Sequence, residues 1–413
     1  MPSGENSSLQ AGKKALIIYL KKRREVMLKM AQRMQRIPTY LFAKIDKKKE
    51  EAKRKGIDLI DLSIGDPDIP TPAHIVEKMK EAVSDPKNHR YPSYEGMIEF
   101  REAISEWYKK RFGVDLDPEK EILTLLGSKD GISHIPFVFL DNGDLSLVPS
   151  PAYPVYKIMT LLAGGIPYIM PLYEENDYLP EIEKIPASVA EKAKLMFINY
   201  PNNPTGAHAN DRFYEELIAF AKKYGIIVCH DAAYSEIYFD DQKPKSILEY
   251  DRKKEISVEF HSLSKTYCMT GWRIGFVVGR KDVISALGRL KANIDSGVFQ
   301  AIQLAAREAL LGDQSCVEEI RQIYKKRRDI LTSGLESIGF SFRKPFATFY
   351  LWVRVPSGFN SESFCEYLIE KAGIVVTPGS GFGEEGEGYF RISLTTSEER
   401  IKEGLERLKK LFS

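Results

Sequence analysis

The apolar positions of this chain form one pattern from about residue 122 to residue 278. Short, nearly continuous apolar runs alternate there with segments of helical periodicity, such as Asp211–Tyr224. Continuous runs are typical of strands buried on both faces. The runs are Ile122–Leu126, Leu145–Val148, Tyr168–Met170, Leu195–Asn199, Ile226–Cys229, Val258–Phe260 and Ile274–Val278. We therefore predict an α/β fold, in which a mostly parallel, seven-stranded type of sheet lies between helices.

A different pattern follows in the C-terminal part of the chain. Apolar and polar residues alternate in Thr348–Val355, as expected for antiparallel strands with one exposed face. The other elements predicted here are a helix from Cys316 to about Ile338, a strand at Phe342–Arg343, a helix near Ser361–Ala372, a strand at Tyr389–Leu394 and a helix from Ser397. They predict a smaller α+β domain.

The N-terminal part divides into two segments. Residues 1–36 carry basic clusters around a short apolar core, which favours a weakly ordered extension. The alternatives are a basic interaction arm and a chain that begins at Met27 or Met30. A helix after Pro38, a strand at Ile57–Ile64 and a helix capped by Thr71-Pro72 are expected next. We predict an extension at 1–36, an arm and part of the small domain at 37–70, a large domain at 71–310 and a small domain at 311–413.

Composition excludes several classes of function. The formal net charge is +2, which gives no overall field for nucleic acid or an anionic membrane. No apolar run approaches the about 20 residues that a membrane helix needs. The four cysteines are far apart and form no Cys-x-x-Cys pair, so we expect neither a metal site nor a disulfide framework. These features predict a soluble cytoplasmic protein.

One polar loop between two predicted strands holds a lysine, Lys265. Hydroxyls at Ser262 and Ser264 flank this lysine, and Arg273 follows. A lysine between core strands loses hydration, so its pKa falls and its amine becomes a usable nucleophile. The hydroxyls and the guanidinium are donors suited to a phosphate. On spacing alone, a surface lysine is the alternative.

The whole stretch from His261 to Gly279 points to a family. Ser-Leu-Ser-Lys followed by Gly-Trp-Arg-Ile-Gly resembles the lysine region of fold-type I, pyridoxal-phosphate-dependent aminotransferases of classes I and II. The resemblance implies the fold-type I architecture and pyridoxal 5'-phosphate as the cofactor. It also implies that Lys265 binds the cofactor covalently, while Ser262 and Arg273 hold its phosphate.

Two predicted strands end in further polar residues. Ligands of open α/β sheets bind beyond the carboxyl ends of the strands. Asn203 lies in the turn after one strand, and Asp231 and Tyr234 follow another. By the resemblance, Asn203 and Tyr234 bind the pyridine 3′-oxygen, and Asp231 pairs with the ring nitrogen and keeps the ring an electron acceptor. We predict Lys265, Asp231 and Tyr234 as catalytic residues; for Asp231 alone, a helix cap is the alternative.

Other parts of the chain complete the expected site. Ser128 and Lys129 open a helix whose unpaired N–H groups attract an anion. The resemblance implies that Tyr153 stacks on the cofactor ring, although a core tyrosine is the alternative. It also implies that Tyr91 reaches the phosphate from the other subunit, which predicts a homodimer with shared active sites.

The resemblance also implies substrate-binding residues. Arg391 matches the arginine that holds the α-carboxylate of the substrate, and Tyr40, Gly65 and Asn203 are the other expected contacts. A guanidinium suits this role because it donates two parallel hydrogen bonds to a carboxylate. A surface arginine is the alternative, but Phe390 and Ile392 flank Arg391 in an apolar strand. The expected partners are therefore amino acids and 2-oxo acids.

Three stretches resemble one branch of the family, the LL-diaminopimelate aminotransferases. They are residues 38–42, 293–303 and 377–383 together with 387–394. This branch transfers an amino group between glutamate and tetrahydrodipicolinate in lysine biosynthesis. Tyr94 is a departure, because the plant-like branch has a glutamate at that position. Aspartate or alanine aminotransferase activity is the same-fold alternative, and a non-catalytic cofactor-binding regulator is the alternative from another class.

Overall fold

The computed structural model describes residues 30–37 and 41–412, without the side chains of 41–44. The chain divides into two compact units, Met1–Pro38 and Thr39–Ser413. In the first unit, the described part contains one 3₁₀ helix, η1 (Gln32–Arg36). Residues 1–29, most of the predicted extension, lie outside the described residues.

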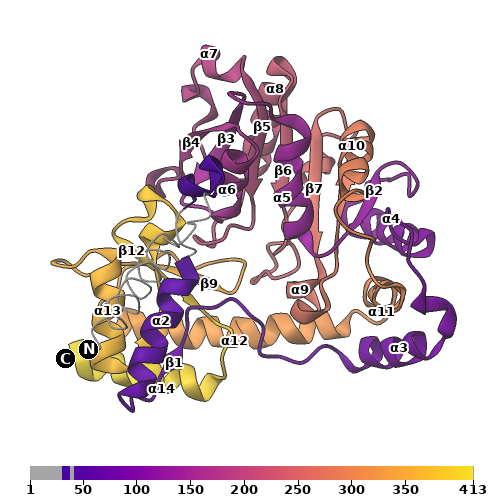
Figure 1. Cartoon of the computed structure of the whole chain (residues 1–413). Helices are drawn as coiled ribbons and strands as arrows, with labels where there is room; N and C mark the ends of the chain where they lie inside the picture. The colour runs from indigo at the N-terminus through magenta and orange to yellow at the C-terminus, as the bar shows by residue number, and fades with distance from the viewer. Residues whose placement is uncertain (1–29, 38–40, 413) are drawn as a thin grey trace, which may run out of the picture. The chain divides into compact units, whose positions relative to one another are not determined.

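A seven-stranded sheet forms the centre of the second unit (Figure 1). Its order is β2-β8-β7-β6-β5-β3-β4; β8 runs antiparallel to both neighbours, and the other pairs are parallel. The strands are β2 (Ile122–Leu125), β3 (Leu145–Ser150), β4 (Ile166–Pro171), β5 (Ala193–Asn199), β6 (Ile227–Asp231), β7 (Ser257–Ser262) and β8 (Gly275–Gly279). The predicted α/β fold with a mostly parallel sheet is confirmed.

Two apolar clusters cover the faces of this sheet. Successive side chains of a strand point to opposite faces, and in β5 Phe197 joins one cluster while Met196 and Ile198 join the other. Helices α5 (Ser128–Phe139), α6 (Val155–Leu162) and α10 (Lys281–Lys291) supply the first cluster. Helices α4 (Ile98–Phe112), α8 (Asp211–Tyr224) and α11 (Gln300–Leu311) supply the second. Both faces of the sheet are therefore buried, as the continuous apolar runs predicted.

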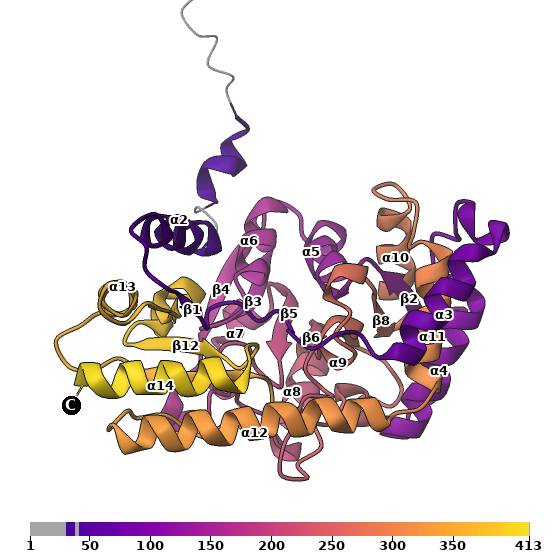
Figure 2. The same ribbon diagram turned by 90° about the horizontal axis from the view of Figure 1, so that it is seen from below.

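A smaller antiparallel sheet with the order β11-β12-β9 forms from the end of the chain. Its neighbour α12 packs against α14 (Figure 2). The elements are β9 (Tyr350–Arg354), β11 (Thr377–Pro378), β12 (Tyr389–Ser393), α12 (Ser315–Ser337), α13 (Ser361–Ala372) and α14 (Glu398–Phe412). Farther back in the sequence, β1 (Ile60–Asp61) pairs in parallel with β10 (Ile374–Val375). This pairing brings the segment after β1 to the smaller sheet.

The remaining elements are short connections and two further helices. These helices are α2 (Leu41–Arg54) and α3 (Ala73–Ser84). The connections are α7 (Ala187–Ala190), α9 (Leu263–Thr266), η2 (Pro86–His89), η3 (Glu174–Asn176), η4 (Ile182–Lys184), η5 (Ile247–Glu249), η6 (Thr270–Trp272), η7 (Gly379–Phe382) and η8 (Glu384–Gly386). Among the described residues, no helix is both long and apolar enough to cross a membrane.

Three local predictions were wrong. β9 is buried on both faces except at Arg354, because Leu351 and Val353 join one apolar cluster while Trp352 packs on another. The predicted strand at 342–343 is reduced to a single bridge with Val353. Thr71 does not cap α3, because its hydroxyl donates to the carbonyl of Cys268. In each case a contact with a distant segment overrides the local pattern.

Candidate active site

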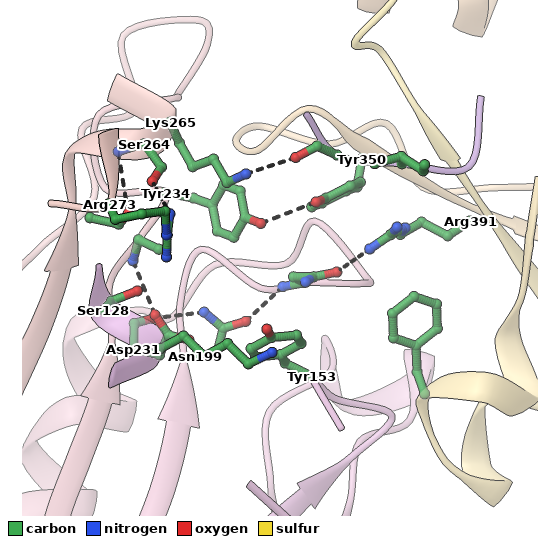
Figure 3. A pocket seen from close by; sticks show the side chains of 17 residues that line it. Ser128, Tyr153, Asn199, Asp231, Tyr234, Ser264, Lys265, Arg273, Tyr350 and Arg391 are labelled. Carbon is green, nitrogen blue, oxygen red and sulfur yellow. Dashed lines mark hydrogen bonds between the residues drawn. The ribbon is translucent and has the colours of Figure 1, made fainter. Parts of the chain in front are cut away.

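A cavity of about 400 Å³ lies at the carboxyl ends of β5, β6 and β7 (Figure 3). The structure brings most of the predicted site residues together here. Those that line the cavity are Gly65, Ser128, Lys129, Tyr153, Asn203, Asp231, Tyr234, Ser262, Lys265, Arg273 and Arg391. Tyr91 does not line it and is 87% exposed in this chain. Tyr40 lies outside the described residues.

Lys265 sits in α9, the short turn that follows β7. The side chain of Ser262 begins this turn by accepting a hydrogen bond from the Ser264 N–H. The Lys265 Nζ donates to the carbonyl of Gly65 at 2.7 Å, across 200 residues of sequence. Burial lowers the pKa of Lys265 to about 8, so about a tenth of the amine is unprotonated at pH 7, far more than for an ordinary lysine.

Asp231 is the last residue of β6 and is buried. Its Oδ2 accepts a hydrogen bond of 2.7 Å from the hydroxyl of Tyr156 in α6. The Asn199 side chain at the end of β5 donates to the Asp231 carbonyl at 2.7 Å, which ties the two strand ends together. Burial raises the pKa of the Asp231 carboxyl. A cation placed against this carboxylate would reverse that shift.

Several donors converge at the beginning of α5. Ser128 is its first residue, after Gly127 at φ +81°. The Arg273 guanidinium lies so close that a Cβ added at Gly127 would come within 2.4 Å of Nη2. Arg273 Nη1 donates to the Thr270 carbonyl at 2.8 Å. Burial and the neighbouring Arg273 lower the pKa of Lys129. Helix N–H groups, a guanidinium and hydroxyls form a donor set that suits a phosphate.

Arg391 of β12 lies at the other end of the cavity and is buried. Its Nη1 donates to Asn203 Oδ1 at 2.7 Å, and its Nη2 donates to the carbonyl of Ser63 at 2.7 Å. The guanidinium stacks over the Tyr350 ring at 4.0 Å and lies 4.7 Å from the Phe382 ring centre. A cation fixed in this way can orient a small carboxylate.

The structure also adds residues that the sequence analysis did not select. Asn199, Tyr350 and Phe382 line the cavity, and the Tyr350 and Tyr234 hydroxyls lie 3.1 Å apart. Asn199 ends a predicted strand, so the rule for strand ends could have found it. Tyr350 and Phe382 carry no such signal, because their place depends on how the smaller sheet packs.

Comparisons with known proteins find similar proteins over most of the chain. The family model described as aminotransferase class I and II matches residues 57–408. LL-diaminopimelate aminotransferase of Moorella thermoacetica is 54% identical over 92% of this chain and 98% of its own length. The enzyme of the same name from Halothermothrix orenii is 56% identical over 92% of this chain and 97% of its own length. The solved structure of apo-BacF from Bacillus subtilis is 41% identical, with a TM-score of 0.90 over 94% of this chain and 99% of its own.

Proposed function

The chain belongs to the class I and II aminotransferase family, and we propose that it transfers an amino group between glutamate and tetrahydrodipicolinate, giving LL-diaminopimelate and 2-oxoglutarate. The convergence of a lysine, a carboxylate and an arginine in one cavity carries this proposal: Lys265, Asp231 and Arg391 all line it. The names of relatives that are more than half identical over most of the chain support the choice of substrate. The reaction serves lysine biosynthesis.

The cofactor of the family is pyridoxal phosphate, and the residues present fit it. When bound, it accepts the electron pair released at the substrate Cα and carries the amino group. In the proposal, Ser128, Ser262 and Arg273 bind the phosphate, Tyr153 packs on the ring, and Lys265 binds the aldehyde carbon. The donor set near α5 supports the phosphate position, and the lowered pKa of Lys265 supports the covalent bond.

Asp231 and Lys265 have separate proton-handling roles in this proposal. Asp231 holds a proton at the ring nitrogen, since a buried carboxylate is stabilised by a cation directly against it. The amine of Lys265, whose pKa is lowered by burial, would act as the base that moves the proton from the substrate Cα. Tyr234 and Asn203 donate to the 3′-oxygen, and the Tyr350 hydroxyl orients Tyr234.

Arg391 binds the α-carboxylate of the amino acid, with Gly65, Asn203 and Tyr40 as further substrate contacts. The carbonyl of Ser63 and the rings of Tyr350 and Phe382 fix the guanidinium plane. A fixed plane orients the Cα–H bond relative to the cofactor, which is the condition for rapid proton transfer.

We further propose a cytoplasmic homodimer in which each subunit completes the other's site. Tyr91 supports this, because a tyrosine that is 87% exposed and does not line its own cavity is available to a partner. Within each subunit, residues 71–310 form the large domain, residues 311–413 form the small domain, and residues 37–70 form an arm and part of the small domain. Residues 1–36 are an extension that catalysis does not need.

The test of the substrate proposal compares stereoisomers. LL-diaminopimelate and meso-diaminopimelate differ only in the geometry of the distal amino acid group, so a site built for the first leaves polar groups unpaired with the second. Unpaired buried groups cost about 1–3 kcal/mol each, which gives discrimination of at least about fivefold. The measurement is kcat/KM for both isomers with 2-oxoglutarate as acceptor. Faster turnover of aspartate or alanine than of the LL isomer would reject the substrate while leaving the aminotransferase activity intact.

A further inference from the structure

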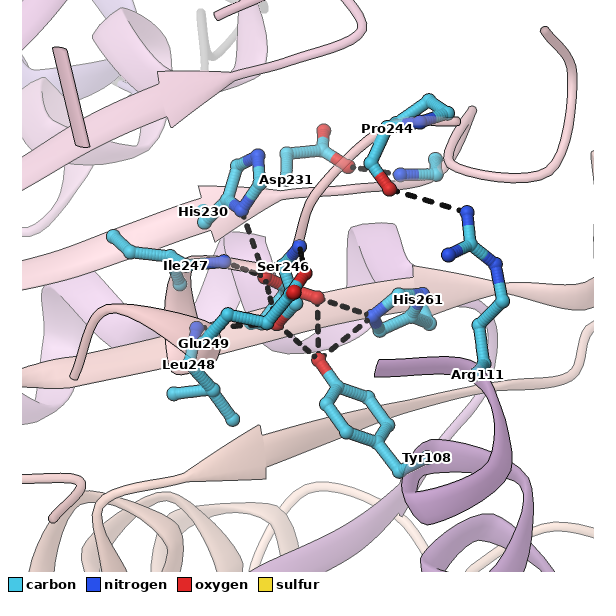
Figure 4. A network of polar contacts seen from close by, with 12 residues as sticks. Tyr108, Arg111, His230, Asp231, Pro244, Ser246, Ile247, Leu248, Glu249 and His261 are labelled. Carbon is cyan, nitrogen blue, oxygen red and sulfur yellow. Dashed lines mark hydrogen bonds and ion pairs between the residues drawn. The ribbon is translucent and has the colours of Figure 1, made fainter. Parts of the chain in front are cut away.

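A fully buried polar network lies on the sheet face that α4 and α8 cover (Figure 4). Glu259 of β7 and His230 of β6 are register partners, so their side chains point to the same face. The next residue of β6, Asp231, points to the other face, where Tyr156 of α6 donates to it. The network therefore lies directly behind the carboxylate of the cavity.

Glu259 accepts hydrogen bonds on both carboxylate oxygens. Oε1 accepts from the Tyr108 hydroxyl and from His261 Nε2 at 2.7 Å, and Oε2 accepts from His230 Nδ1 at 2.8 Å, Ser246 Oγ at 3.0 Å and the Ile247 N–H at 2.8 Å. Although burial opposes ionisation, His230 and His261 lower the pKa of Glu259 below its usual range. A carboxyl with this many donors is a carboxylate.

His230 has an oxygen atom within hydrogen-bond distance of each ring nitrogen. Its Nε2 lies 2.9 Å from the backbone carbonyl of Tyr200, which can only accept. Its Nδ1 lies 2.8 Å from the Glu259 carboxylate, which also can only accept. Both ring nitrogens therefore face oxygen atoms, the arrangement in which an imidazolium ion makes two hydrogen bonds, although the ring is fully buried.

Other charged and aromatic groups lie around the Glu259–His230 pair. Glu249 accepts from the Ser246 N–H at 2.9 Å, on the side of η5. On the side of α4, Arg111 is paired with Glu236 at 3.0 Å. From α8, the centre of the Tyr214 ring lies 5.8 Å from that of His230, and the rings of Trp107 and Phe276 lie 5.5 Å and 5.0 Å from that of His261. The nearest counter-charge for the imidazolium is therefore Glu259.

We propose that the Glu259–His230 ion pair is a positioning element for Asp231. The imidazolium places a fixed positive charge one residue before Asp231 and favours its ionised form. Glu259 and His261 hold the end of β7, where Ser262 begins the lysine turn, in register with the end of β6. The pair thus favours the ionised form of Asp231 and holds Ser262 in position, although neither Glu259 nor His230 lines the cavity. This inference rests on the proposed role of Asp231.

The first experiment observes the ion pair in the cofactor-free protein. We expect ring ¹⁵N chemical shifts of His230 to show two protonated nitrogens at pH 7, with the signals assigned by their loss in His230→Gln. In Glu259→Gln the same ring is expected to be neutral, because a buried cation without its counter-charge is strongly disfavoured. A neutral His230 ring in the unmodified protein would overturn the proposal, even if Glu259→Gln does not fold and whatever the enzyme's substrate is.

The second experiment tests whether Glu259 acts on Asp231 or only stabilises the fold. In Glu259→Gln we expect kcat to fall on the order of tenfold, with little change in KM. The acid limb of the kcat–pH profile should move to higher pH, since Asp231 ionises less readily without the imidazolium. Asp251→Asn is the matched control: Asp251 is equally buried and accepts from Ile256 and Ser257 at the start of β7. Equal pH profiles for Glu259→Gln and the unmodified enzyme would contradict the positioning role.

Discussion

The two ends of the cavity are built in different ways. At the lysine end, Lys265 and Asp231 stand at the carboxyl ends of two adjacent strands of one sheet. At the arginine end, Arg391 comes from the smaller sheet and is held by the carbonyl of Ser63 and the side chain of Asn203, each more than 180 residues away in sequence. The strand order of the large sheet positions the lysine end, whereas packing between segments that are distant in sequence positions the arginine end.

The electrostatics of the two ends differ as well. Burial shifts the pKa of both Lys265 and Asp231 toward the neutral form, so the charge of each depends on what lies against it in the cavity. The guanidinium of Arg391 does not titrate in the working range; it is fixed between the rings of Tyr350 and Phe382. We therefore expect changes at the lysine end to affect kcat, and changes at the arginine end to affect KM and substrate choice.

The largest effect is expected for Lys265→Ala. Loss of the amine removes the covalent link and the base, so turnover should fall by about 10⁴-fold or more while the cofactor still binds. Rate measurements of each half-reaction, together with borohydride trapping and peptide mapping of the unmodified enzyme, check this. Lys291→Gln is a control, since Lys291 is also buried but pairs with Asp295. Trapping at a lysine other than Lys265 would refute the assignment.

Asp231→Asn should follow, with a loss of about 10³-fold in kcat. The amide keeps the size and the contact with Tyr156 but removes the charge that holds a proton at the ring nitrogen. Cofactor affinity, measured by equilibrium dialysis, should change much less than turnover. A variant with near-normal kcat would show that the lysine end works without this charge.

A smaller effect, about 10²-fold in kcat/KM, is expected for Arg391→Lys. A lysine keeps the positive charge but loses the two parallel hydrogen bonds that orient a carboxylate, so KM for the amino acid should rise. Arg354→Lys serves as the control, because Arg354 is exposed and pairs with Glu174 at 2.7 Å. If kcat falls and KM stays constant, the proposed division between the two ends is wrong.

The smallest effect concerns the stability of the cofactor-free protein. The pKa of Lys265 is about 8 in the folded chain against an ordinary value of 10.5. Between these values the unfolded chain binds a proton that the folded chain has lost, so the free energy of unfolding increases with pH. The increase from pH 8 to pH 10 should be about 2 kcal/mol larger than in Lys265→Met, measured by urea unfolding. Identical pH dependence in both proteins would argue against a desolvated lysine.

The sequence predicted the lysine end better than the arginine end. Apolar runs located the strands to within a few residues, and α8 and α13 have the predicted bounds. Because ligands bind where parallel strands end, Asp231 and the lysine turn could be placed from local sequence. Ser128 could be placed in the same way, because it closely follows a predicted strand, whereas the role of Arg273 came from the family resemblance.

The arginine end depended on information that local patterns lack. Alternation in Thr348–Val355 predicted an exposed face, but packing on both sides buries β9 and brings Tyr350 into the cavity. Phe382 enters from η7, which has no periodic signal. The contacts of His230 were also beyond the sequence, because they depend on the carbonyl of Tyr200, which follows β5, and on the carboxylate of Glu259 in β7. Long-range packing decides each of these features.

The short segment Ser63–Gly65 gives one backbone carbonyl to Arg391 and another to Lys265. A ligand that binds both Lys265 and Arg391 in the cavity replaces the hydrogen bonds from these two side chains to the backbone of Ser63–Gly65. We therefore expect the amide hydrogen exchange of Ser63–Gly65 to report whether a ligand is bound. Mass spectrometry can measure this exchange in the absence of turnover. Its signal would distinguish a ligand that engages only one cation from a ligand that spans the cavity.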